Sequence, residues 1–391
     1  MHDLTRNAPS TDDLDKAFRA ALGKMTGGLS TLPYTNAWAD WAHQLSNSPG
    51  RQSELQQDAI ARTLATFQFA ARAMSGQPVP PNEGLPGAPD SRYAAPAWSQ
   101  YPFNVWAHAF QQGAGWWQSL NQGVDGLPSS QADLVGFTVQ QWLEALAPAN
   151  FLASNPELLE LTRAEGGENL RRGLQNYLED TGRTMKGLGP VGTEGFQLGV
   201  NIAATPGKVV LQNELIELIQ YSPTTADVYA EPILIVPAWI MKYYILDLSA
   251  KNSLVKYLVD QGHTVFMVSW KNPQPSDRDC DMDTYLKLGL RASLAAVSAL
   301  VPEQKIHTVG YCIGGTLLAI GAAALGREND HRIASVTLLA AQTDFSEPGE
   351  LSLFINPSQL AMLEAKMREE GVLDSKQMGG AFQMLRPRDL I

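Results

Sequence analysis

The sequence predicts an α/β fold in which a mostly parallel sheet follows a helical N-terminal half. In the second half of the chain, four continuous apolar runs alternate with segments of helix length, at residues 233–236, 264–269, 306–310 and 335–340. Strands that are apolar on both faces are typical of parallel sheets covered by helices. Before residue 206, apolar residues recur instead at the spacing of a helix face. With 391 residues, 44% hydrophobic and 18% charged, the composition is that of a globular protein with more than one domain.

The first 75 residues are expected to form an amphipathic helical arm, followed by a linker. Five apolar residues between Gln52 and Met74 recur near helical spacing: Leu55, Ile60, Leu64, Phe67 and Ala71. We expect this face to pack on a partner or on another helix. Residues 76–97 hold six prolines and several glycines, a composition typical of a linker.

Residues 98–205 are expected to form a helical N-terminal domain. Ser129 and Ser130 precede a helix that runs toward Leu146, Asn155 opens a second helix, and a third helix covers residues 168–180. Seven of the nine tryptophans lie in the first 150 residues. They form either an exposed apolar surface that binds a hydrophobic phase or the packing between helices, and the sequence leaves both interpretations open.

Residues 206–391 are expected to form the sheet domain. Residues 209–212 and 215–221 indicate a strand pair that precedes the four apolar runs. The third run ends in the pentapeptide Gly310-Tyr311-Cys312-Ile313-Gly314, and an apolar helical pattern follows it. This arrangement predicts a nucleophile elbow, a strained turn between strand and helix, with cysteine as the nucleophile. The alternative is a buried, inert cysteine between two glycines.

The elbow assigns further site residues. Three small residues let strand and helix approach each other closely: Gly310, Gly314 and Gly315. The backbone N–H of Ile313, at the start of the helix, points to where an oxyanion would form. A second oxyanion donor is expected in the loop after the 233–236 strand, at Trp239 or Ile240. Acyl transfer through a covalent cysteine thioester is the reaction that this geometry serves.

Charge and cysteine content exclude several classes of function. A net charge of -11 without any run of Lys or Arg argues against nucleic acid as a partner. Cys280 and Cys312 are too few for a disulfide scaffold, and no apolar stretch is long enough to span a bilayer, so we expect a cytoplasmic protein. The six histidines are scattered and neither cysteine has a partner at ligand spacing, so we expect no metal site.

Four motifs closely resemble those of the polyhydroxyalkanoate synthases, class I. They are Gly310–Thr316, Ser269–Pro273, Pro148–Leu152 and Tyr243–Leu248, and the resemblance runs from about Leu134 to the C-terminus. It implies an α/β-hydrolase-type fold and an acyltransferase that polymerises (R)-3-hydroxyacyl units from coenzyme A thioesters on the thiolate of Cys312, with release of coenzyme A. It also implies no cofactor besides the coenzyme A of the substrate, a homodimer, and a cytoplasmic location on the surface of polyester granules.

The resemblance further implies an Asp and a His partner of the nucleophile, for which this sequence has no matching positions. Family members carry them after two strands that follow a lid, whereas this sequence stops at Ile391 in a segment, from about Leu351, that resembles the lid. We therefore expect the domain at 206–391 to be incomplete at its C-terminal end and truncated within the lid region. The chain alone is expected to be weak or inactive.

No histidine of the sheet domain is expected to replace the missing base. Three precede or begin strands, at the end of the sheet opposite the nucleophile: His263, His307 and His331. At about 3.3 Å per residue, five residues place His307 roughly 16 Å from Cys312. Asp344 lies beyond the last strand at the catalytic edge, where we expect it to form a turn, and we expect Asp247 to cap a helix or form a turn.

Two other functions fit parts of the sequence. An α/β-hydrolase, such as a thioesterase or an intracellular polyester depolymerase, would use the same elbow with water as the acceptor. A non-catalytic protein that binds granules or pairs with a synthase subunit would use the tryptophan-rich helical half. Product analysis separates the first from a synthase, and granule association that does not depend on Cys312 would favour the second.

Overall fold

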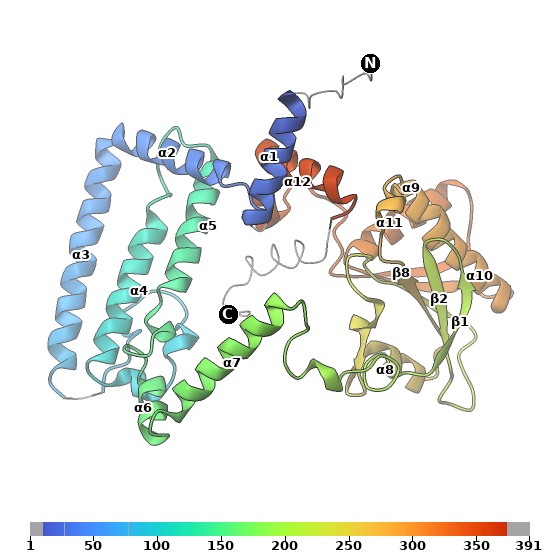
Figure 1. Cartoon of the computed structure of the whole chain (residues 1–391), viewed down its shortest axis with the longest axis horizontal. Coiled ribbons are helices and arrows are strands. Elements are labelled where there is room, and N and C mark those ends of the chain that lie inside the picture. Colours follow the sequence, from blue (N-terminus) through green and yellow to red (C-terminus); the bar gives the residue numbers. More distant parts are fainter. Residues whose placement is uncertain (1–10, 27, 77, 374–391) are drawn as a thin grey trace, which may run out of the picture. The chain divides into compact units, whose positions relative to one another are not determined.

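The computed structural model describes residues 11–26, 28–76 and 78–373 of the chain. They form two compact units, which are visible in Figure 1. A helical unit contains the described residues up to Leu188 together with Gly349–Lys366, and a sheet unit contains Gly189–Pro348 and the described residues from Met367. The end of the expected lid segment, residues 374–391, lies outside the described residues.

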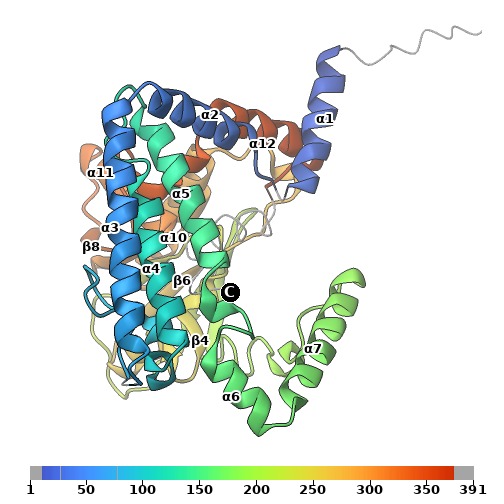
Figure 2. The ribbon, with the colours of Figure 1, turned by 90° about the vertical axis from the view of Figure 1, so that its left-hand side faces the viewer.

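The helical unit is built around helices that lie side by side. Its α-helices before residue 189 are α1 (Thr11–Met25), α2 (Leu32–Ser46), α3 (Pro49–Ala73), α4 (Phe103–Ser119), α5 (Ser129–Ala145), α6 (Pro156–Ala164) and α7 (Glu168–Met185). Helix α4 contacts both α3 and α5, and α2 packs on α5 (Figure 2). The expected cap of α6 is confirmed, because the Asn155 side chain accepts hydrogen bonds from the N–H groups of Glu157 and Leu158.

The segment up to residue 75, expected as a separate arm, packs on the following helices in the structure. Helix α3 lies along α4, and Leu55, Phe69 and Ala73 are the residues that it buries. Ile60, Leu64 and Phe67, part of the face expected to be covered, are exposed. The difference arises because α3 carries two apolar stripes, and Phe69 rather than Phe67 stacks on His108 of α4, with ring centroids 3.9 Å apart.

The tryptophans of the helical unit divide between the two interpretations. Trp98 is fully buried. The indole N–H of Trp41 donates to the Leu120 carbonyl at 3.0 Å, and that of Trp116 donates to the Leu55 carbonyl at 2.9 Å. Three others remain exposed: Trp106, Trp117 and Trp142. Tryptophan therefore serves both the packing between helices and the surface of this unit.

The sequence predicts one domain over 206–391, but residues 349–366 belong to the helical unit. Leu353 is buried in the cluster formed by α2 and α5, and Phe354 contacts Phe137 with ring centroids 5.9 Å apart. The helix that follows, α12 (Pro357–Glu370), carries Gln359, whose side chain accepts from the N–H of Ser30 at 2.8 Å. The chain returns to this unit because these side chains complete its core.

The sheet unit contains a six-stranded sheet in the order β1-β2-β6-β3-β7-β8. The strands are β1 (Gly207–Gln212), β2 (Ile216–Tyr221), β3 (Ile233–Val236), β6 (Val265–Trp270), β7 (Ile306–Tyr311) and β8 (Ile333–Leu339), and a separate pair is formed by β4 (Asp247–Ser249) and β5 (Asn252–Ser253). The pairs β6/β3, β3/β7 and β7/β8 are parallel, whereas β1/β2 and β2/β6 are antiparallel. The expected strand pair before the apolar runs is present as β1 and β2. The prediction of a mostly parallel sheet behind a helical region is confirmed.

Helices cover both faces of the central strands. Helices α10 (Ala292–Leu300) and α11 (Ile313–Arg327) contribute Leu294, Leu317 and Leu318 to a cluster with Leu234 and Phe266 of the sheet. On the other face, α8 (Leu254–Asp260) packs Val255 and Val259 against Ile235 and Met267. A short helix, α9 (Met282–Thr284), leads into a π-helical turn at Tyr285–Arg291 before α10. Strand β7, which leads to Cys312, thus lies inside a packed sheet.

Strand β8 differs from its prediction as a buried strand. It is the last strand of the sheet within the described residues, and Val336, Leu338 and Leu339 are more than a third exposed. A sequence rich in apolar residues is not enough to bury a strand, because burial also needs elements that cover its faces. Among the described helices, none is long and apolar enough to cross a bilayer.

Candidate active site

The backbone around Cys312 has the shape of an elbow. Strand β7 ends at Tyr311 and α11 begins at Ile313, so Cys312 alone forms the turn between them. Its φ of 54° and ψ of -132° lie in a region that non-glycine residues rarely adopt, at a cost of about 1–3 kcal/mol. The N–H of Cys312 donates to the Leu339 carbonyl of β8 at 2.9 Å, which fixes the strained residue beside its neighbouring strand.

Close approach of neighbouring segments explains the three elbow glycines. A Cβ atom added to Gly310 would lie 2.3 Å from the Cα atom of Gly315, and one on Gly314 would lie 2.3 Å from the Pro237 oxygen. A Cβ atom on Gly315 would lie 2.5 Å from that of Ala341. Real Cβ atoms do not approach other atoms so closely, so larger residues would force strand, loop and helix apart.

The three expected oxyanion donors lie on two segments that the sheet brings together. Val236, the last residue of β3, pairs with Gly310 of β7, so the loop that carries Trp239 and Ile240 starts beside the elbow. Within the described part of the chain, no hydrogen bond is donated by the N–H groups of Ile313, Trp239 or Ile240. An N–H at the first position of a helix has no partner inside that helix, which leaves it available to a ligand. The donor roles remain predictions.

Trp239, in the loop after β3, belongs to a cluster of three aromatic rings. Trp239 contacts Trp270 at 5.9 Å and Tyr285 at 4.8 Å between ring centroids, and Trp270 contacts Tyr285 at 5.4 Å. The indole N–H of Trp270 donates to the Pro237 carbonyl at 2.7 Å, and this hydrogen bond is buried. Burial raises the pKa of the Tyr285 hydroxyl above its ordinary value. Sequence reasoning missed Trp270 as part of the site, although it stands in one of the motifs that carry the resemblance.

The structure places the titratable candidates His307 and Asp344 in hydrogen bonds that do not involve Cys312. His307 lies near the start of β7, where its Nδ1 atom is 2.7 Å from the Ser335 hydroxyl. Asp344 accepts a hydrogen bond from the N–H of Ser346 at 2.9 Å, and the hydrogen bonds from Ser346 hold the pKa of Asp344 below its ordinary value. No hydrogen bond among the described residues involves the Sγ atom of Cys312.

Asp247 is more deeply built into the fold than a turn residue. Its buried carboxylate accepts from the hydroxyls of Thr205 at 2.7 Å and Ser253 at 2.6 Å, and its carbonyl accepts from the N–H of Ala203 at 2.9 Å. It ties the segment before β1 to the β4–β5 pair, which is why residues 189–205 belong to the sheet unit and not to the expected helical domain at 98–205.

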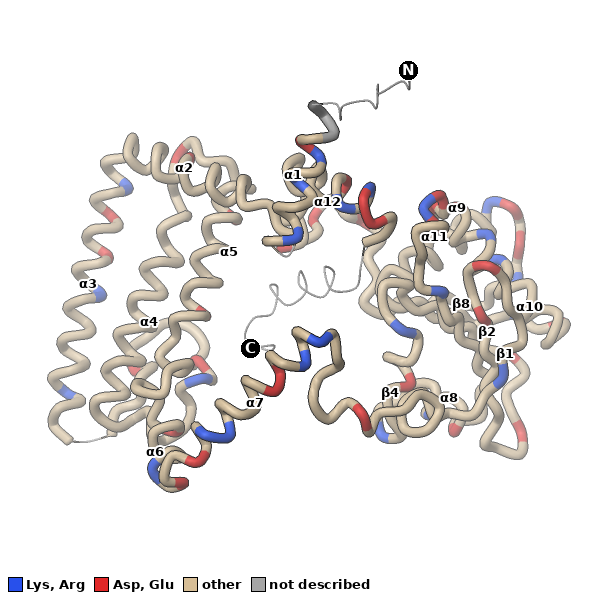
Figure 3. The backbone as a smooth tube through the Cα atoms, in the orientation of Figure 1, with Lys and Arg blue, Asp and Glu red and all other residues tan. Residues whose placement is uncertain are grey.

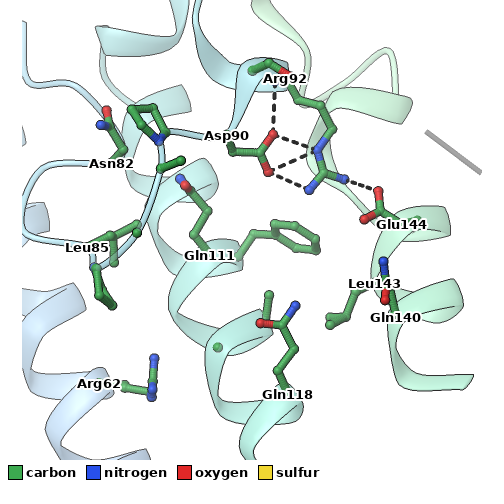
Figure 4. Close-up of a pocket in the computed structure, with 18 residues that line it drawn as sticks. Arg62, Asn82, Leu85, Asp90, Arg92, Gln111, Gln118, Gln140, Leu143 and Glu144 are labelled. Atoms are coloured by element: carbon green, nitrogen blue, oxygen red, sulfur yellow. Dashed lines mark hydrogen bonds and ion pairs between the residues drawn. The ribbon is translucent and has the colours of Figure 1, made fainter. Parts of the chain in front are cut away.

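A hollow of about 400 Å³ lies in the helical unit, lined in part by the segment that the sequence predicts to be a linker. Figure 4 shows Arg92 between the carboxylates of Asp90 and Glu144, with distances of 2.6 and 2.8 Å. Gln111 and Gln118 of α4 also line this hollow. Neither a cysteine nor a histidine is among its described lining residues, so it does not offer the chemistry of the elbow.

Comparison with known proteins defines the class first. The alpha/beta hydrolase fold model matches residues 231–385, which include the elbow. The model of the poly-beta-hydroxybutyrate polymerase (PhaC) N-terminus matches residues 89–258, and a second N-terminal model of the same polymerase matches residues 9–51. The sheet unit is therefore an α/β-hydrolase fold preceded by a polymerase-type N-terminal region.

Relatives then define the family. A poly(3-hydroxyalkanoate) polymerase from Methylorubrum extorquens is 38% identical over 85% of this chain and 54% of its own length. Polymerase subunits from Rhizobium etli and Cupriavidus necator are 39% and 34% identical, over 95% and 88% of this chain and 58% of their own length. The chain belongs to the poly(3-hydroxyalkanoate) polymerase family. It spans little more than half the length of these relatives.

Proposed function

We propose that this chain carries the acyl-accepting site of a poly(3-hydroxyalkanoate) polymerase. The Sγ atom of Cys312 attacks the carbonyl carbon of an (R)-3-hydroxyacyl-coenzyme A thioester, and coenzyme A leaves as its thiol. The oxyanion is held by the N–H of Ile313 and by that of Trp239 or Ile240. The hydroxyl oxygen of another hydroxyacyl unit then attacks the new thioester, an ester bond forms, and the Cys312 sulfur is released. The observation that carries this proposal is the strained Cys312 at the elbow.

The choice of cysteine supports the proposal on chemical grounds. Transfer from coenzyme A to Cys312 exchanges one thioester for another, so the acyl group stays activated for attack by the next hydroxyl. A serine ester would lose this activation. A thiol also ionises more readily than a hydroxyl and is the stronger nucleophile once ionised.

We propose that the chain alone turns over slowly. No described histidine or carboxylate is hydrogen-bonded to the Cys312 sulfur, so within the described ranges no side chain is in place to take its proton or to protonate the leaving group. Each such proton transfer is worth roughly 10²–10⁴ in rate.

The test is the release of coenzyme A from (R)-3-hydroxybutyryl-coenzyme A. It compares this chain, its Cys312→Ala variant, and the chain mixed with a relative's C-terminal segment. Release that requires Cys312 and rises with the added segment supports the proposal, and the product must be a polyester. A free hydroxy acid as product would instead identify a hydrolase, and absence of release in every mixture would contradict an acyl-transfer function.

Granule association, a cytoplasmic location and a homodimer are further parts of the proposal. Ile60, Leu64 and Phe67 form an exposed apolar stripe on α3, as an apolar polyester surface would require. Helix α7 adds exposed Leu174 and Leu178, and Figure 3 shows that acidic and basic residues are interspersed along it. Relatives are named as polymerase subunits, which fits assembly with another chain, and we propose that the other chain is a second copy. Co-sedimentation with polyhydroxybutyrate particles measures granule association, and sedimentation equilibrium measures the oligomeric state.

A further inference from the structure

Trp270, at the end of β6, is in hydrogen-bond contact with the segment that leads into the oxyanion loop. The residue is 9% exposed, and its indole N–H donates to the Pro237 carbonyl at 2.7 Å. Pro237 follows β3 directly, and Trp239 comes two residues later. A single buried side chain therefore fixes one peptide group at the base of the loop that is proposed to hold the oxyanion.

Helix α11, which begins directly after Cys312, confines the Pro237 carbonyl from a second direction. Its oxygen lies where a Cβ atom of Gly314 would be, 2.3 Å from the ideal position of that atom. A peptide group is planar, so a fixed carbonyl also fixes the direction of the N–H of Ala238 and the path of the chain after it. The indole of Trp270 and the first turn of α11 together set how the backbone enters Trp239 and Ile240.

The ring of Trp270 is itself held by the π-helical turn at Tyr285–Arg291. A Cβ atom added to Gly289 in this turn would lie 2.4 Å from the Cη2 atom of Trp270, so the ring lies directly against the glycine backbone. Tyr285 contacts the ring from the same turn, with centroids 5.4 Å apart. Removal of the indole N–H would leave the buried Pro237 carbonyl without this donor, and a side chain at Gly289 would push the ring out of its place.

We propose that Trp270 is a positioning residue for the oxyanion loop, and that Gly289 provides the space that keeps its indole N–H on the Pro237 carbonyl. The inference rests on the proposed acyl transfer at Cys312. It assigns Trp270 no contact with the reacting atoms: the residue acts through the backbone of Pro237 and Ala238. Its effect should therefore appear in steps that develop an oxyanion and not in steps that need only the thiolate.

Two reactions of the Cys312 sulfur distinguish an effect on the oxyanion from an effect on the thiolate. Acylation of Cys312 by (R)-3-hydroxybutyryl-coenzyme A passes through an oxyanion, whereas alkylation by iodoacetamide does not. Both rates are measured by mass spectrometry of the Cys312 peptide in the full chain, and the exposed Cys280 serves as an internal reference for alkylation. The variants are Trp270→Phe, which keeps a ring but loses the N–H, and Gly289→Ala. The control is Gly326→Ala, where an added Cβ atom has no neighbour within 4 Å.

We expect Trp270→Phe and Gly289→Ala each to slow acylation by about tenfold or more, since loss of one oxyanion donor costs roughly 10²–10³. Alkylation of Cys312 should change by less than about twofold, and Gly326→Ala should change neither rate. Equal loss of both rates would mean that the variants damage the fold or the thiol, and unchanged acylation would mean that the loop needs no support from Trp270. Either result overturns the inference.

A second measurement does not depend on acyl transfer. Amide hydrogen exchange in a peptide that covers residues 237–242 should be faster in Trp270→Phe and Gly289→Ala than in the parent chain, and unchanged in Gly326→Ala. If the parent chain gives no Cys312 acylation, the proposed function fails while this measurement still decides the positioning role. Unchanged exchange in both variants would contradict it.

Discussion

The elbow of the sheet unit and helix α3 of the helical unit represent opposite degrees of constraint. Around Cys312, three positions have no room even for a methyl group. Along α3, large apolar side chains lie in solvent, and Phe67 is 68% exposed although Phe69, two residues later, is fully buried. The comparison teaches that the cost of a substitution in this chain depends on what surrounds the position and not on the type of residue that occupies it.

The two phenylalanines of α3 provide the largest expected contrast. Phe69→Ala removes a buried ring that stacks on His108, and it should lower the free energy of unfolding by about 3–5 kcal/mol. Phe67→Ala should change the free energy of unfolding by no more than about 0.5 kcal/mol, because the ring is already mostly exposed in the folded protein. Urea unfolding of both variants measures the difference. Similar losses would show that the outer stripe of α3 is covered in solution.

Phe67 also tests the proposed granule surface. Phe67→Ala should weaken co-sedimentation with polyhydroxybutyrate particles while the protein stays folded, because the exposed ring contributes apolar contact area. The control is Tyr257→Ala, since Tyr257 is similarly exposed but lies on α8 of the sheet unit. Equal binding by the two variants would remove α3 from the binding surface.

At the elbow, Gly314→Ala should be strongly destabilising. The added methyl group would meet backbone atoms of Val236 and Pro237 at 2.5 Å or less, and overpacking of this kind costs about 3 kcal/mol. Gly326→Ala, on the same helix but in open space, should be neutral or stabilise slightly. Thermal and urea unfolding measure both variants. A Gly314→Ala protein as stable as the Gly326→Ala protein would mean that loop and helix can move apart.

Backbone strain at Cys312 gives a smaller effect of opposite sign. Cys312→Gly and Cys312→Ala both remove the thiol, but only glycine adopts a φ of 54° with a ψ of -132° without strain. The glycine variant should be more stable than the alanine variant by about 1–2 kcal/mol. The difference in urea midpoints measures it. No difference would indicate that the backbone relaxes at this turn when the thiol is absent.

The smallest expected effect is a pH dependence of the free energy of unfolding, caused by a histidine of the helical unit. Burial lowers the pKa of His108 below its ordinary value, with a smaller lowering from Arg72 and opposing effects from its hydrogen bond to Pro81 and from Glu83. The unfolded chain then binds the proton more readily. The contribution of neutral His108 to the free energy of unfolding is fully present above the unfolded pKa of about 6.5. It is lost as the pH decreases through the lower folded pKa.

The test is to compare unfolding at pH 7.5 and pH 5.5. The parent should lose more stability over this range than His108→Phe, which keeps an aromatic ring beside Phe69 but cannot bind the proton. Equal losses would assign the acid sensitivity to other groups.

Features that depend on local pattern could be predicted from the sequence. The strands, the elbow and its glycines are encoded by residues that are neighbours in the sequence. An apolar strand pattern ends just before Cys312 and an apolar helix pattern begins just after it. The choice of Phe69 over Phe67 could not be predicted, since both lie at helical spacing and only the position of α4 decides between them. The return of Leu353 to the helical unit depends on a cluster more than 200 residues earlier in the chain.

The partners of Trp270 show the same limit at the site. The motif Ser269–Pro273 identifies the tryptophan, but its hydrogen bond joins β6 to the residue after β3, and its space is provided by a glycine on a third element. No spacing in the sequence connects Pro237, Trp270 and Gly289. The available signal was a tryptophan at the end of an apolar run. Such a residue is expected to be buried, and a buried indole N–H usually finds a hydrogen-bond acceptor.

The π-helical turn at Tyr285–Arg291 has a consequence for how the site tolerates insertion and deletion. Gly289 lies against Trp270, and its neighbour Leu290 fills the place where Gly321 of α11 has no side chain, 2.2 Å from the ideal Cβ position there. Two adjacent residues thus face two different elements, which the wider turn permits. Loss of one residue before Gly289 would turn both residues by about 100° about the helix axis, away from Trp270 and Gly321. The length of this segment is therefore as constrained as the identity of its glycine.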